Sequence, residues 1–535
     1  MSKENILNNR LYLYITEFFS GMAVMAVELA ASRLIAPYFS SSQIVWTIII
    51  GTIMIAMALG NVLGGKWADR DDDPSRLFRR IIIAAVWIAL IPVVGKYIIL
   101  LVTGLMVVTI STNLLIWASF ITCMVLFVYP LFLLGTVTPS LIHYTVKSTS
   151  ESGTVSGRLS ACNTTGSIIG TFLPTFVTIP AVGTSATFLI FSGILLVLGI
   201  IYFVFAGKRR VGAVAAAVIF AAAAIFGHTS DFAFWEDDLT YEGESVYNYL
   251  QVKDTARATI LSTNVMFGVQ SIYMKESAMT GMYYDYAMAA PVMTGEAAPK
   301  VLILGMGTGT YATTLLKYYP DADITGVEID EKIIRLSREY FNLPESVPVA
   351  EYDGRAYLDA IDDTYDIIMV DAYRDITIPF QMSTTEFFAS VRHHLNDGGV
   401  MVVNMNMYEE DSEDITAYLS DTIAGVFEYV VTVDVDGNTN RELFASDGAI
   451  MSRFEAGRDD LSSGMSLAPS DATREYIAMM DRVSEGLKEY EAGDLILTDD
   501  KAPVELLGMR AMDSIIEREL DLYRDDLLDE IKGIF

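Results

Sequence analysis

The sequence predicts a multi-pass α-helical membrane domain of about seven spans, followed by a small β unit and an α/β domain built on a doubly wound sheet. Three observations support this fold class. Hydrophobic residues make up 52% of the 535 residues, and the long apolar runs fall within residues 1–227. The remainder of the chain is strongly acidic. Within that remainder, short apolar strands alternate with helical segments from residue 300 onward.

The first domain, residues 1–227, contains apolar stretches of about 20 residues, the length that crosses a bilayer as a helix. These stretches are residues 12–36, 43–64, 81–103, 113–141, 163–181, 185–206 and 211–227. Two motifs in them, GNVLGG (Gly60, Gly64) and GSIIG (Gly166, Gly170), have the spacing of small residues that lets helices approach closely. We therefore expect the lipid bilayer to be a partner of this domain.

Charge divides the chain in the same place. Residues 1–227 carry 14 basic and 8 acidic side chains, whereas residues 228–535 carry 22 basic and 59 acidic ones. The resulting net charges are +6 and −37. The acidic region repels phosphates, so we exclude nucleic acid as a partner and expect attraction to polycations. The two cysteines lie in apolar segments and the four histidines lack ligand spacing, so we predict no metal site.

We divide the acidic region into a linker with a small β unit, residues 228–295, and an α/β domain, residues 296–535. The segment 245–274 is rich in Val, Ile, Tyr and Thr with period-2 stretches, which is typical of antiparallel strands. The strands predicted after it are 300–306, 322–330, 347–352, 365–373, 398–406, 429–435 and 441–446. Alternation of such strands with helices predicts a Rossmann-like sheet, which binds ligands at the carboxyl ends of its strands.

The first of these strands runs into the turn GMGTGT, residues 305–310. Its three glycines, Gly305, Gly307 and Gly309, let the backbone turn tightly and approach a ligand in front of a helix N-terminus. Thr310 stands where a dinucleotide-binding G-x-G-x-x-G motif has its last glycine. We therefore assign this turn, including Thr308, to a nucleoside ligand.

Acidic residues end the next strands in order. Glu328 can accept hydrogen bonds from both ribose hydroxyls, and Asp353 can accept one from an adenine amino group. Asp371 ends the following strand, over the expected cavity. A glycine turn followed by three acids fits an S-adenosyl ligand better than a dinucleotide.

These segments resemble the polyamine aminopropyltransferase (spermidine synthase) family. The resemblance lies in VLILGMGTGT, VEIDEKII, YDGRAYL, YDIIMVDAY, STTEFF and LNDGGVMVVN. ELAASRLIAPYF, GNVLGGKWADR and ILTDDKAPVELL resemble a membrane-fused branch of that family, in which about seven spans precede the synthase domain. The resemblance covers nearly the whole chain.

The resemblance implies transfer of an aminopropyl group from decarboxylated S-adenosylmethionine to an amine, with no tightly bound cofactor. It implies that Glu328 holds the ribose, that Asp353 and Gly354 hold the adenine, and that Asp371 is the general base. A base is needed because an ammonium has no lone pair with which to attack carbon. Members commonly form dimers, so a homodimer is one candidate assembly.

The resemblance also assigns residues to two ligand sites. Asn248, which aligns with a glutamine of the family, joins the nucleoside site. The amine site receives Gln270, Tyr283, Tyr284 and Tyr373.

The chain departs from the soluble members at several positions. Thr308 replaces an aspartate of the glycine turn, Arg374 replaces the second acid of the catalytic loop, and Tyr284 replaces a histidine. Losing two carboxylates weakens the expectation of a putrescine-like acceptor. The nearby acids that we consider as replacements are Asp285, Asp375, Asp499 and Asp500.

Two alternatives therefore stay open. The first is a methyltransferase that uses intact S-adenosylmethionine, because Thr308 tolerates the methionine carboxylate better than an aspartate does. The second is a polyamine transporter or sensor whose C-terminal domain only binds its ligand.

The distribution of basic residues predicts a multi-pass cell-membrane protein but leaves one question open. Basic residues cluster at the N-terminus and in the loops 66–80, 143–160 and 207–210, which places the N-terminus in the cytoplasm. Seven spans then place the acidic region outside, whereas a nucleoside co-substrate favours the cytoplasm. Both sides of the membrane stay open for this region.

Overall fold

The computed structural model describes residues 10–71, 73–109, 113–206, 210–229, 231–236, 238–265, 268–373, 378–408, 414–463 and 471–518. The chain forms two compact units, each of which is described by itself. The first comprises residues 1–236, 242–249 and 264–266, and the second comprises residues 237–241, 250–263 and 267–535. The domain boundaries expected after residues 227 and 295 stay predictions.

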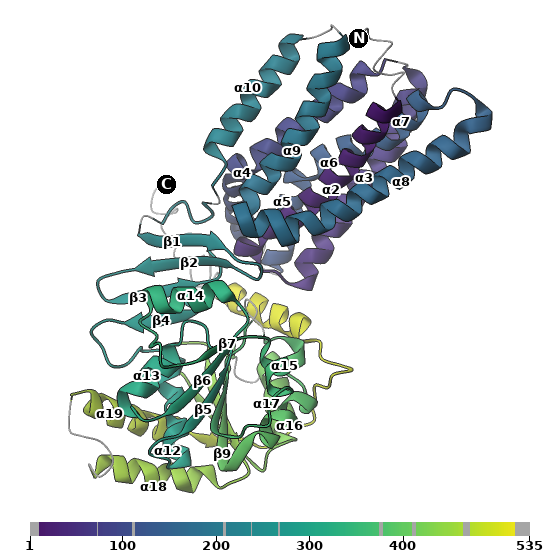
Figure 1. Ribbon diagram of the computed structural model, residues 1–535. Coiled ribbons are helices and arrows are strands. Elements are labelled where there is room, and N and C mark those ends of the chain that lie inside the picture. Colours follow the sequence, from purple (N-terminus) through teal and green to yellow (C-terminus); the bar gives the residue numbers. More distant parts are fainter. Residues whose placement is uncertain are drawn as a thin grey trace, which may run out of the picture. The chain divides into compact units, whose positions relative to one another are not determined.

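The first unit is a bundle of helices, coloured purple to teal in Figure 1. Its described helices are α2 (Arg10–Phe39), α3 (Gln43–Arg70), α4 (Ser75–Thr109), α5 (Leu114–Leu126), α6 (Val128–Gly135), α7 (Val137–Thr145), η1 (Thr149–Glu151), α8 (Ser152–Leu173), η2 (Pro174–Thr178), α9 (Ile179–Ala206) and α10 (Arg210–Phe226).

Four helical stretches of this unit are long and apolar enough to cross a membrane. They are Arg10–Phe39, Gln43–Arg70, Ser75–Val107 and Thr149–Phe205. A fifth results if Leu114–Leu126 and Val128–Thr145, bent by 49°, form one span. The described residues thus give four or five candidate spans, where the sequence predicted about seven.

The difference arises in the last third of the unit. The predicted spans 163–181 and 185–206 fall within one helical stretch, Thr149–Phe205, which is broken at Gly183, where φ is +83°. The predicted span 211–227 corresponds to an apolar helix of 17 residues, α10, which is shorter than the others. Apolar composition locates lipid-compatible segments, but it does not reveal whether a glycine between two of them separates or only kinks the helices.

Both small-residue motifs lie where helices pack closely. A Cβ atom added to Gly166 of α8 would lie 1.9 Å from the carbonyl oxygen of Phe18 on α2, and one added to Gly170 would lie 2.1 Å from that of Met22. In the same way, Gly60 and Gly64 of the motif GNVLGG on α3 lie against the backbone of α6 and of Thr136, the residue that follows it. Only glycine allows backbones this close, so the motifs set the interhelical distances.

A four-stranded sheet precedes the α/β domain along the chain. Its strands are β1 (Leu239–Glu244), β2 (Tyr249–Asp254), β3 (Ala258–Ser262) and β4 (Ser271–Met274), in the order β1-β2-β3-β4. β3 pairs antiparallel with both β2 and β4, as predicted for the small β unit. Leu250, Val252 and Leu261 of this sheet pack against Ile333 and Leu336 of the helix α14 (Glu331–Tyr340).

The rest of the second unit is an α/β domain. Its strands are β5 (Lys300–Leu304), β6 (Asp323–Glu328), β7 (Val349–Glu351), β8 (Tyr365–Val370), β9 (Leu395–Met405), β10 (Tyr429–Asp434), β11 (Arg441–Ser446) and β12 (Lys488–Glu489). Its described helices are α11 (Tyr283–Ala287), α12 (Ala289–Thr294), α13 (Thr310–Tyr318), α14 (Glu331–Tyr340), α15 (Gly354–Leu358), η3 (Phe380–Met382), α16 (Thr385–His393), α17 (Ile415–Ala424), α18 (Ile450–Ser462) and α19 (Asp471–Gly486).

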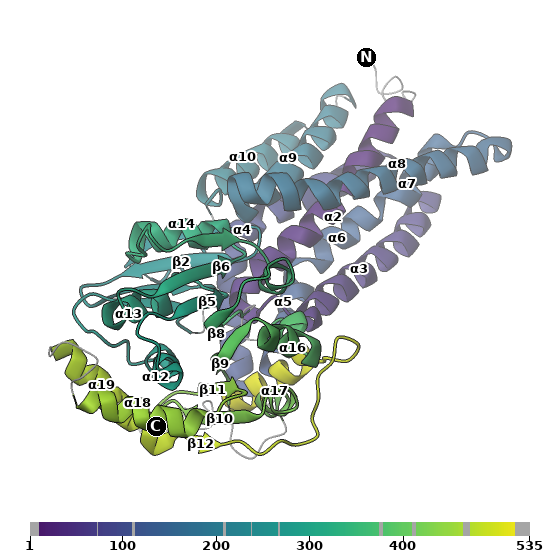
Figure 2. The ribbon, with the colours of Figure 1, turned by 60° about the horizontal axis from the view of Figure 1, so that its bottom comes forward.

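The large sheet has the order β12-β10-β11-β9-β8-β5-β6-β7. The strands from β9 to β7 are parallel, whereas β11, β10 and β12 add to β9 in antiparallel pairs. The sheet is therefore Rossmann-like but mixed, with an antiparallel edge that the sequence pattern did not distinguish. Figures 1 and 2 show α12, α13, α18 and α19 on one side of the sheet and α15, α16 and α17 on the other.

The strand order places a switch point beside β5. From β5 the chain continues to β6 and β7 on one side, and then crosses to β8 and β9 on the other. Loops that leave two adjacent parallel strands in opposite directions open a crevice at their carboxyl ends. The turn after β5 and the loop after β8 meet there.

We predict that helix packing in the first unit depends on Gly166 and not on glycine content in general. Gly166→Ala forces a methyl group against the backbone of α2 and should lower the midpoint of thermal unfolding of the purified full-length chain by several degrees, equivalent to about 1–3 kcal/mol. Gly157→Ala is the matched control. Gly157 lies on the same helix as Gly166, and a Cβ atom added there would meet no atom within 4 Å. Equal stability of the two variants would contradict the prediction.

Candidate active site

The glycine turn after β5 adopts a backbone that requires glycine. Gly305, Gly307 and Gly309 have φ values of +80°, +55° and +83°, in the left-handed region that other residues rarely adopt. A Cβ atom on Gly305 would also lie 2.4 Å from the Cα atom of Ala372, in the loop after β8. The turn and that loop therefore touch through their backbones at the switch point.

The small β unit supports this turn from its other side. The backbone N–H of Thr308 donates to Ser271 Oγ at 3.3 Å, and Thr310 Oγ1 donates to the carbonyl oxygen of Ile272 at 2.8 Å. Both supporting residues lie on β4 and were not predicted. Thr308 itself is buried, and its hydroxyl has no hydrogen-bond partner among the described residues.

Glu328, at the end of β6, ties the turn to the neighbouring strand. One carboxylate oxygen accepts from the backbone N–H of Gly307 at 2.9 Å and the other from that of Asp330 at 3.0 Å. Burial raises the pKa of Glu328 to about 7, although these backbone donors oppose the shift. Each oxygen keeps a second acceptor position for a ligand hydroxyl.

Asp353 precedes α15 and caps it. Its carboxylate accepts from the backbone N–H of Ala356 at 3.0 Å, which satisfies one donor of the first helical turn. Gly354 follows at the start of the helix, where a Cβ atom would lie 3.0 Å from Met382 Cε. The two residues predicted to hold an adenine therefore form a well-defined helix N-terminus.

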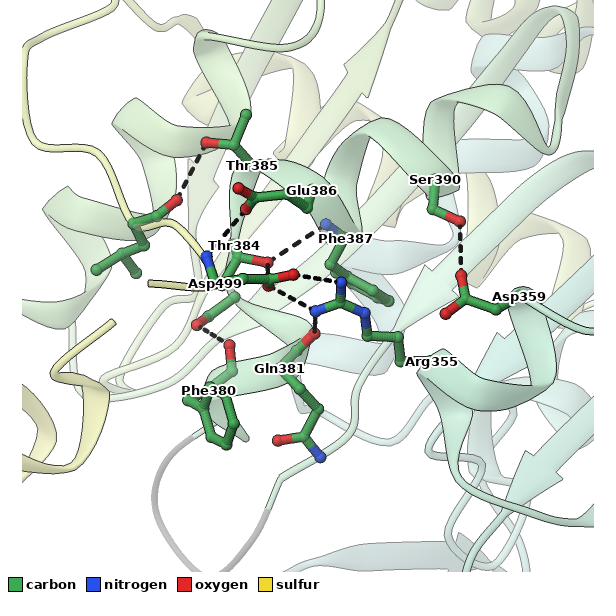
Figure 3. A network of polar contacts seen from close by, with 12 residues as sticks. Arg355, Asp359, Phe380, Gln381, Thr384, Thr385, Glu386, Phe387, Ser390 and Asp499 are labelled. Atoms are coloured by element: carbon green, nitrogen blue, oxygen red, sulfur yellow. Dashed lines mark hydrogen bonds and ion pairs between the residues drawn. The ribbon is translucent and has the colours of Figure 1, made fainter. Parts of the chain in front are cut away.

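A charged network holds α15 in place (Figure 3). Two nitrogens of Arg355 donate to the two carboxylate oxygens of Asp499, each at 2.7 Å, and one also donates to the carbonyl oxygen of Gln381. Thr384 Oγ1 donates to the same carboxylate at 2.7 Å, and Glu386 accepts from the backbone N–H of Asp499. The hydrogen bond from Arg355 lowers the pKa of Asp499 to about 2.

Two acids considered as replacements for lost family carboxylates thus have structural partners. Asp499 binds Arg355, and Asp285 accepts from Thr280 and from the backbone N–H of Gly281. Arg374 and Asp375 lie outside the described residues.

Asp371 is the centre of a buried polar cluster at the end of β8. Its backbone N–H donates to the carbonyl oxygen of Leu304 at 2.9 Å, which fixes it beside the glycine turn. Tyr283 donates its hydroxyl to one carboxylate oxygen at 2.7 Å, and Asn404 Nδ2 donates to the other at 2.9 Å. Burial raises the pKa of Asp371 to about 7, and both hydrogen bonds oppose the shift.

A second layer orients these donors. Asn404 Oδ1 accepts from Asn440 Nδ2 at 2.8 Å, which sets the direction of the Asn404 amide. The hydroxyl of Tyr373 donates to the carbonyl oxygen of Asn404 and accepts from the backbone N–H of Asn406. Neither Asn404 nor Asn440 was predicted, because an amide in a strand has no motif that marks it as functional.

The tyrosine pair of α11 joins the cluster to the small β unit. The ring centroids of Tyr283 and Tyr284 are 4.0 Å apart, and the hydroxyl of Tyr284 donates to the carbonyl oxygen of Gln270 at 2.9 Å. Of the four residues predicted for the amine site, Tyr283 contacts Asp371 directly and Tyr284 and Tyr373 are one residue removed, whereas Gln270 connects to it only through Tyr284 and Tyr283. Their roles stay predictions.

Asn248 is the predicted site residue that these contacts do not include. It lies between β1 and β2, where its backbone N–H and carbonyl oxygen both bond to Ser245. Residues 242–249 belong to the first compact unit, whereas the glycine turn belongs to the second. Its assignment to a nucleoside site stays a prediction.

The arrangement places a carboxylate that can accept a proton beside the glycine turn. A carboxylate whose pKa is near neutrality changes protonation easily at physiological pH, and its two donors fix its direction. The glycine turn, Glu328 and Asp353 stand at the carboxyl ends of adjacent strands, where a nucleoside binds a sheet of this kind.

Comparisons with known proteins relate the chain to one family. A family profile described as the spermine/spermidine synthase domain matches residues 281–435. The chain is 52% identical over 340 residues to a probable polyamine aminopropyl transferase of Bifidobacterium longum. The aligned region covers 62% of this chain and 76% of that protein. It is 33% identical over 148 residues to a polyamine aminopropyltransferase of Pyrobaculum calidifontis, covering 24% of this chain and 50% of that protein.

Solved structures align with part of the chain. A crystal structure of a probable spermidine synthase from Corynebacterium glutamicum aligns with a TM-score of 0.36 and 19% identity, covering 48% of this chain and 98% of that one. The sequence relationship to the Bifidobacterium protein is far closer. On that relationship, the chain belongs to the polyamine aminopropyltransferase family of transferases.

Proposed function

We propose that the protein is a membrane-bound aminopropyltransferase that transfers the aminopropyl group of decarboxylated S-adenosylmethionine to an amine, with Asp371 as general base. The observation that carries the proposal is the buried Asp371 carboxylate, held by Tyr283 and Asn404 beside the glycine turn. The relatives in the comparison are aminopropyl transferases, so we retain this function over a methyltransferase, a transporter or a sensor.

The chemistry is a displacement at carbon. The neutral nitrogen of the acceptor amine attacks the propyl carbon next to the sulfonium, a C–N bond forms, and the C–S bond breaks. The electron pair of that bond stays on sulfur, which leaves neutral methylthioadenosine. Asp371 takes the proton that the nitrogen must lose, and the hydrogen bonds from Tyr283 and Asn404 keep its carboxylate directed at the amine.

We assign the nucleoside to the strand ends around the glycine turn. In this assignment Glu328 accepts from the ribose hydroxyls, while Asp353 and Gly354 face the adenine. The turn residues Gly305, Gly307, Thr308 and Gly309 let the backbone approach the ligand closely. Gln270, Tyr283, Tyr284 and Tyr373 are kept as the wall of the amine site.

We propose seven passages for the membrane domain. A straight helix of 57 residues, Thr149–Phe205, would reach about 85 Å, which far exceeds a hydrocarbon core of about 30 Å. The break at Gly183 therefore supports two spans, and α10 supplies another. Together with α2, α3, α4 and the bent pair, these make seven.

The direct test uses the purified full-length protein in detergent or nanodiscs. It is incubated with decarboxylated or intact S-adenosylmethionine and a panel of amines, and the products are identified by mass spectrometry. We expect aminopropylated amine and methylthioadenosine from the decarboxylated form. Methylated product from the intact form would instead support the methyltransferase alternative, and binding without product would support a sensor.

We predict that Asp371→Asn lowers kcat/KM for aminopropyl transfer by about 10²–10⁴-fold, because an amide of the same shape accepts no proton. The variant should keep the thermal stability of the wild-type protein within a few degrees. Product formation is followed by mass spectrometry and folding by thermal unfolding. Unchanged activity in a folded variant would remove Asp371 from the mechanism.

We predict an acidic limb in the pH profile of kcat/KM with a midpoint at about pH 7. Asp371 accepts a proton only when ionised, and burial raises its pKa to about 7, so activity is present above that pH and falls about tenfold per unit below it. Tyr283→Phe removes a hydrogen bond that stabilises the carboxylate and should move the midpoint upward. Glu328→Gln is the control, because burial also raises the pKa of Glu328 to about 7. The acidic limb of the pH profile should persist in this variant if Asp371 is its source. Loss of the limb in Glu328→Gln would assign it to Glu328.

We predict that Arg355→Lys raises KM for decarboxylated S-adenosylmethionine by about tenfold with little change in kcat, because lysine cannot reproduce the paired hydrogen bonds to Asp499 that hold α15. Arg392→Lys, in an exposed ion pair with Asp447 in the same unit, should leave KM unchanged. Equal effects of the two substitutions would show that the Arg355 network does not position the nucleoside site.

A further inference from the structure

A second buried carboxylate near Asp371 has no role in the mechanism above. Glu442 lies in β11, its side chain is 0% exposed, and neither carboxylate oxygen has a hydrogen-bond partner among the described residues. In the strand pairing it stands directly opposite Asn404 of β9. Asn404 in turn donates to Asp371, so one residue separates the two acids.

The two acids share one face of the sheet. Side chains alternate along a strand, so Asn404 points to the same side as Val402, two residues before it on β9. Glu442 likewise points to the same side as Phe444, two residues after it on β11. Val402 and Phe444 belong to the core cluster that also contains Tyr283 of α11. The carboxylate of Glu442 therefore faces the layer from which Tyr283 reaches Asp371.

The ionised form of such an acid is unfavourable unless a cation accompanies it, and protonation is the alternative. A buried carboxylate without donors is costly as an anion, so burial raises the pKa of Glu442 well above its usual range, and the nearby Asp371 raises it further. The described part of the chain places no lysine or arginine in an ion pair with Glu442. An ammonium group would supply both the missing positive charge and three hydrogen-bond donors.

Building on the proposed function, we propose that Glu442 binds the ammonium group at the non-reacting end of a diamine or polyamine acceptor. Asp371 serves the nitrogen that attacks, and Glu442 holds the one that does not. The enzyme would then select acceptors with a second amino group over monoamines of the same length. Glu442 is thus a specificity-determining residue, and no motif in the sequence marks it.

The proposal predicts a release of protons when the acceptor binds. In the free protein Glu442 favours its protonated form, because burial and the nearby Asp371 raise its pKa. A diammonium ligand favours the ionised form of both. Calorimetric titration with 1,4-diaminobutane, in buffers of different ionisation enthalpy and with methylthioadenosine present, measures the protons released, and Glu442→Gln should release fewer.

The decisive experiment compares two acceptors of equal length, 1,4-diaminobutane and butylamine, with the full-length protein. Glu442→Gln should lower kcat/KM for the diamine by about 50-fold or more and change that for butylamine by no more than about threefold. Glu442→Asp keeps a carboxylate and should keep part of the preference for the diamine. The ratio of the two kcat/KM values is the readout, because a purely structural role would not change it.

Asp421→Asn is the matched control. Asp421 is also a buried acid of the second unit, but it accepts hydrogen bonds from Tyr490, Gly493 and Leu495. Its substitution should reduce stability and leave the diamine preference unchanged. If Glu442→Gln behaves in the same way, or loses both acceptors equally, the inference is wrong.

The outcomes separate this inference from the proposed function. Should the wild-type protein transfer no aminopropyl group, the proposed function fails, and the calorimetric affinity for 1,4-diaminobutane decides the role of Glu442. Binding at least about tenfold weaker in Glu442→Gln supports the inference. Equal affinity overturns it. If Glu442→Gln fails to fold, the Glu442→Asp variant decides, because it keeps a carboxylate. An active Glu442→Asp variant that has lost the preference for the diamine would contradict the inference.

Discussion

The architecture of the site depends on one close backbone contact. Gly305 leaves β5 in a left-handed conformation and passes so near Ala372 that no side chain fits between them. This contact brings the loops after β5 and β8 together at the switch point of the sheet. Glu328 then binds the turn from β6, and β4 supports it through Ser271. A bulkier residue at position 305 would separate the nucleoside-binding turn from the proposed base.

Around that contact, burial and hydrogen bonding act in opposite directions on the acids. Burial alone would keep Asp371 protonated, whereas the donors Tyr283 and Asn404 stabilise its ionised form, and the pKa of about 7 is their balance. Glu328 reaches a similar balance through backbone donors. Glu442 has no donor among the described residues, so burial prevails there, and we propose a cationic ligand as its partner. The three acids therefore differ in their surroundings and not in their chemistry.

Much of the fold and part of the site followed from local patterns. The apolar strands, the glycine turn and the acids at strand ends were predicted because each depends on a few adjacent residues. The structure gives four or five candidate spans where the sequence predicted about seven, because apolar composition does not show how the chain behaves at Gly183. The antiparallel edge of β11, β10 and β12 was also missed, since alternation of strands and helices does not report strand direction. Asn404 and Asn440 carry no motif and were found only through their contacts.

The sequence by itself determined the class of the protein, the division into an apolar and an acidic region, and the glycine turn and strand-end acids that we propose to bind a nucleoside. These depend on hydrophobicity, glycine conformation and charge, which are local properties of the chain. The tertiary structure alone decided which acids are buried, which donors reach them, and which one is left without a partner. Pairing between strands places Glu442 of β11 opposite Asn404 of β9, about 40 residues away in the sequence, and only that pairing brings it near Asp371. Charge and hydrogen bonding at the site depend on such distant contacts, which no local pattern encodes.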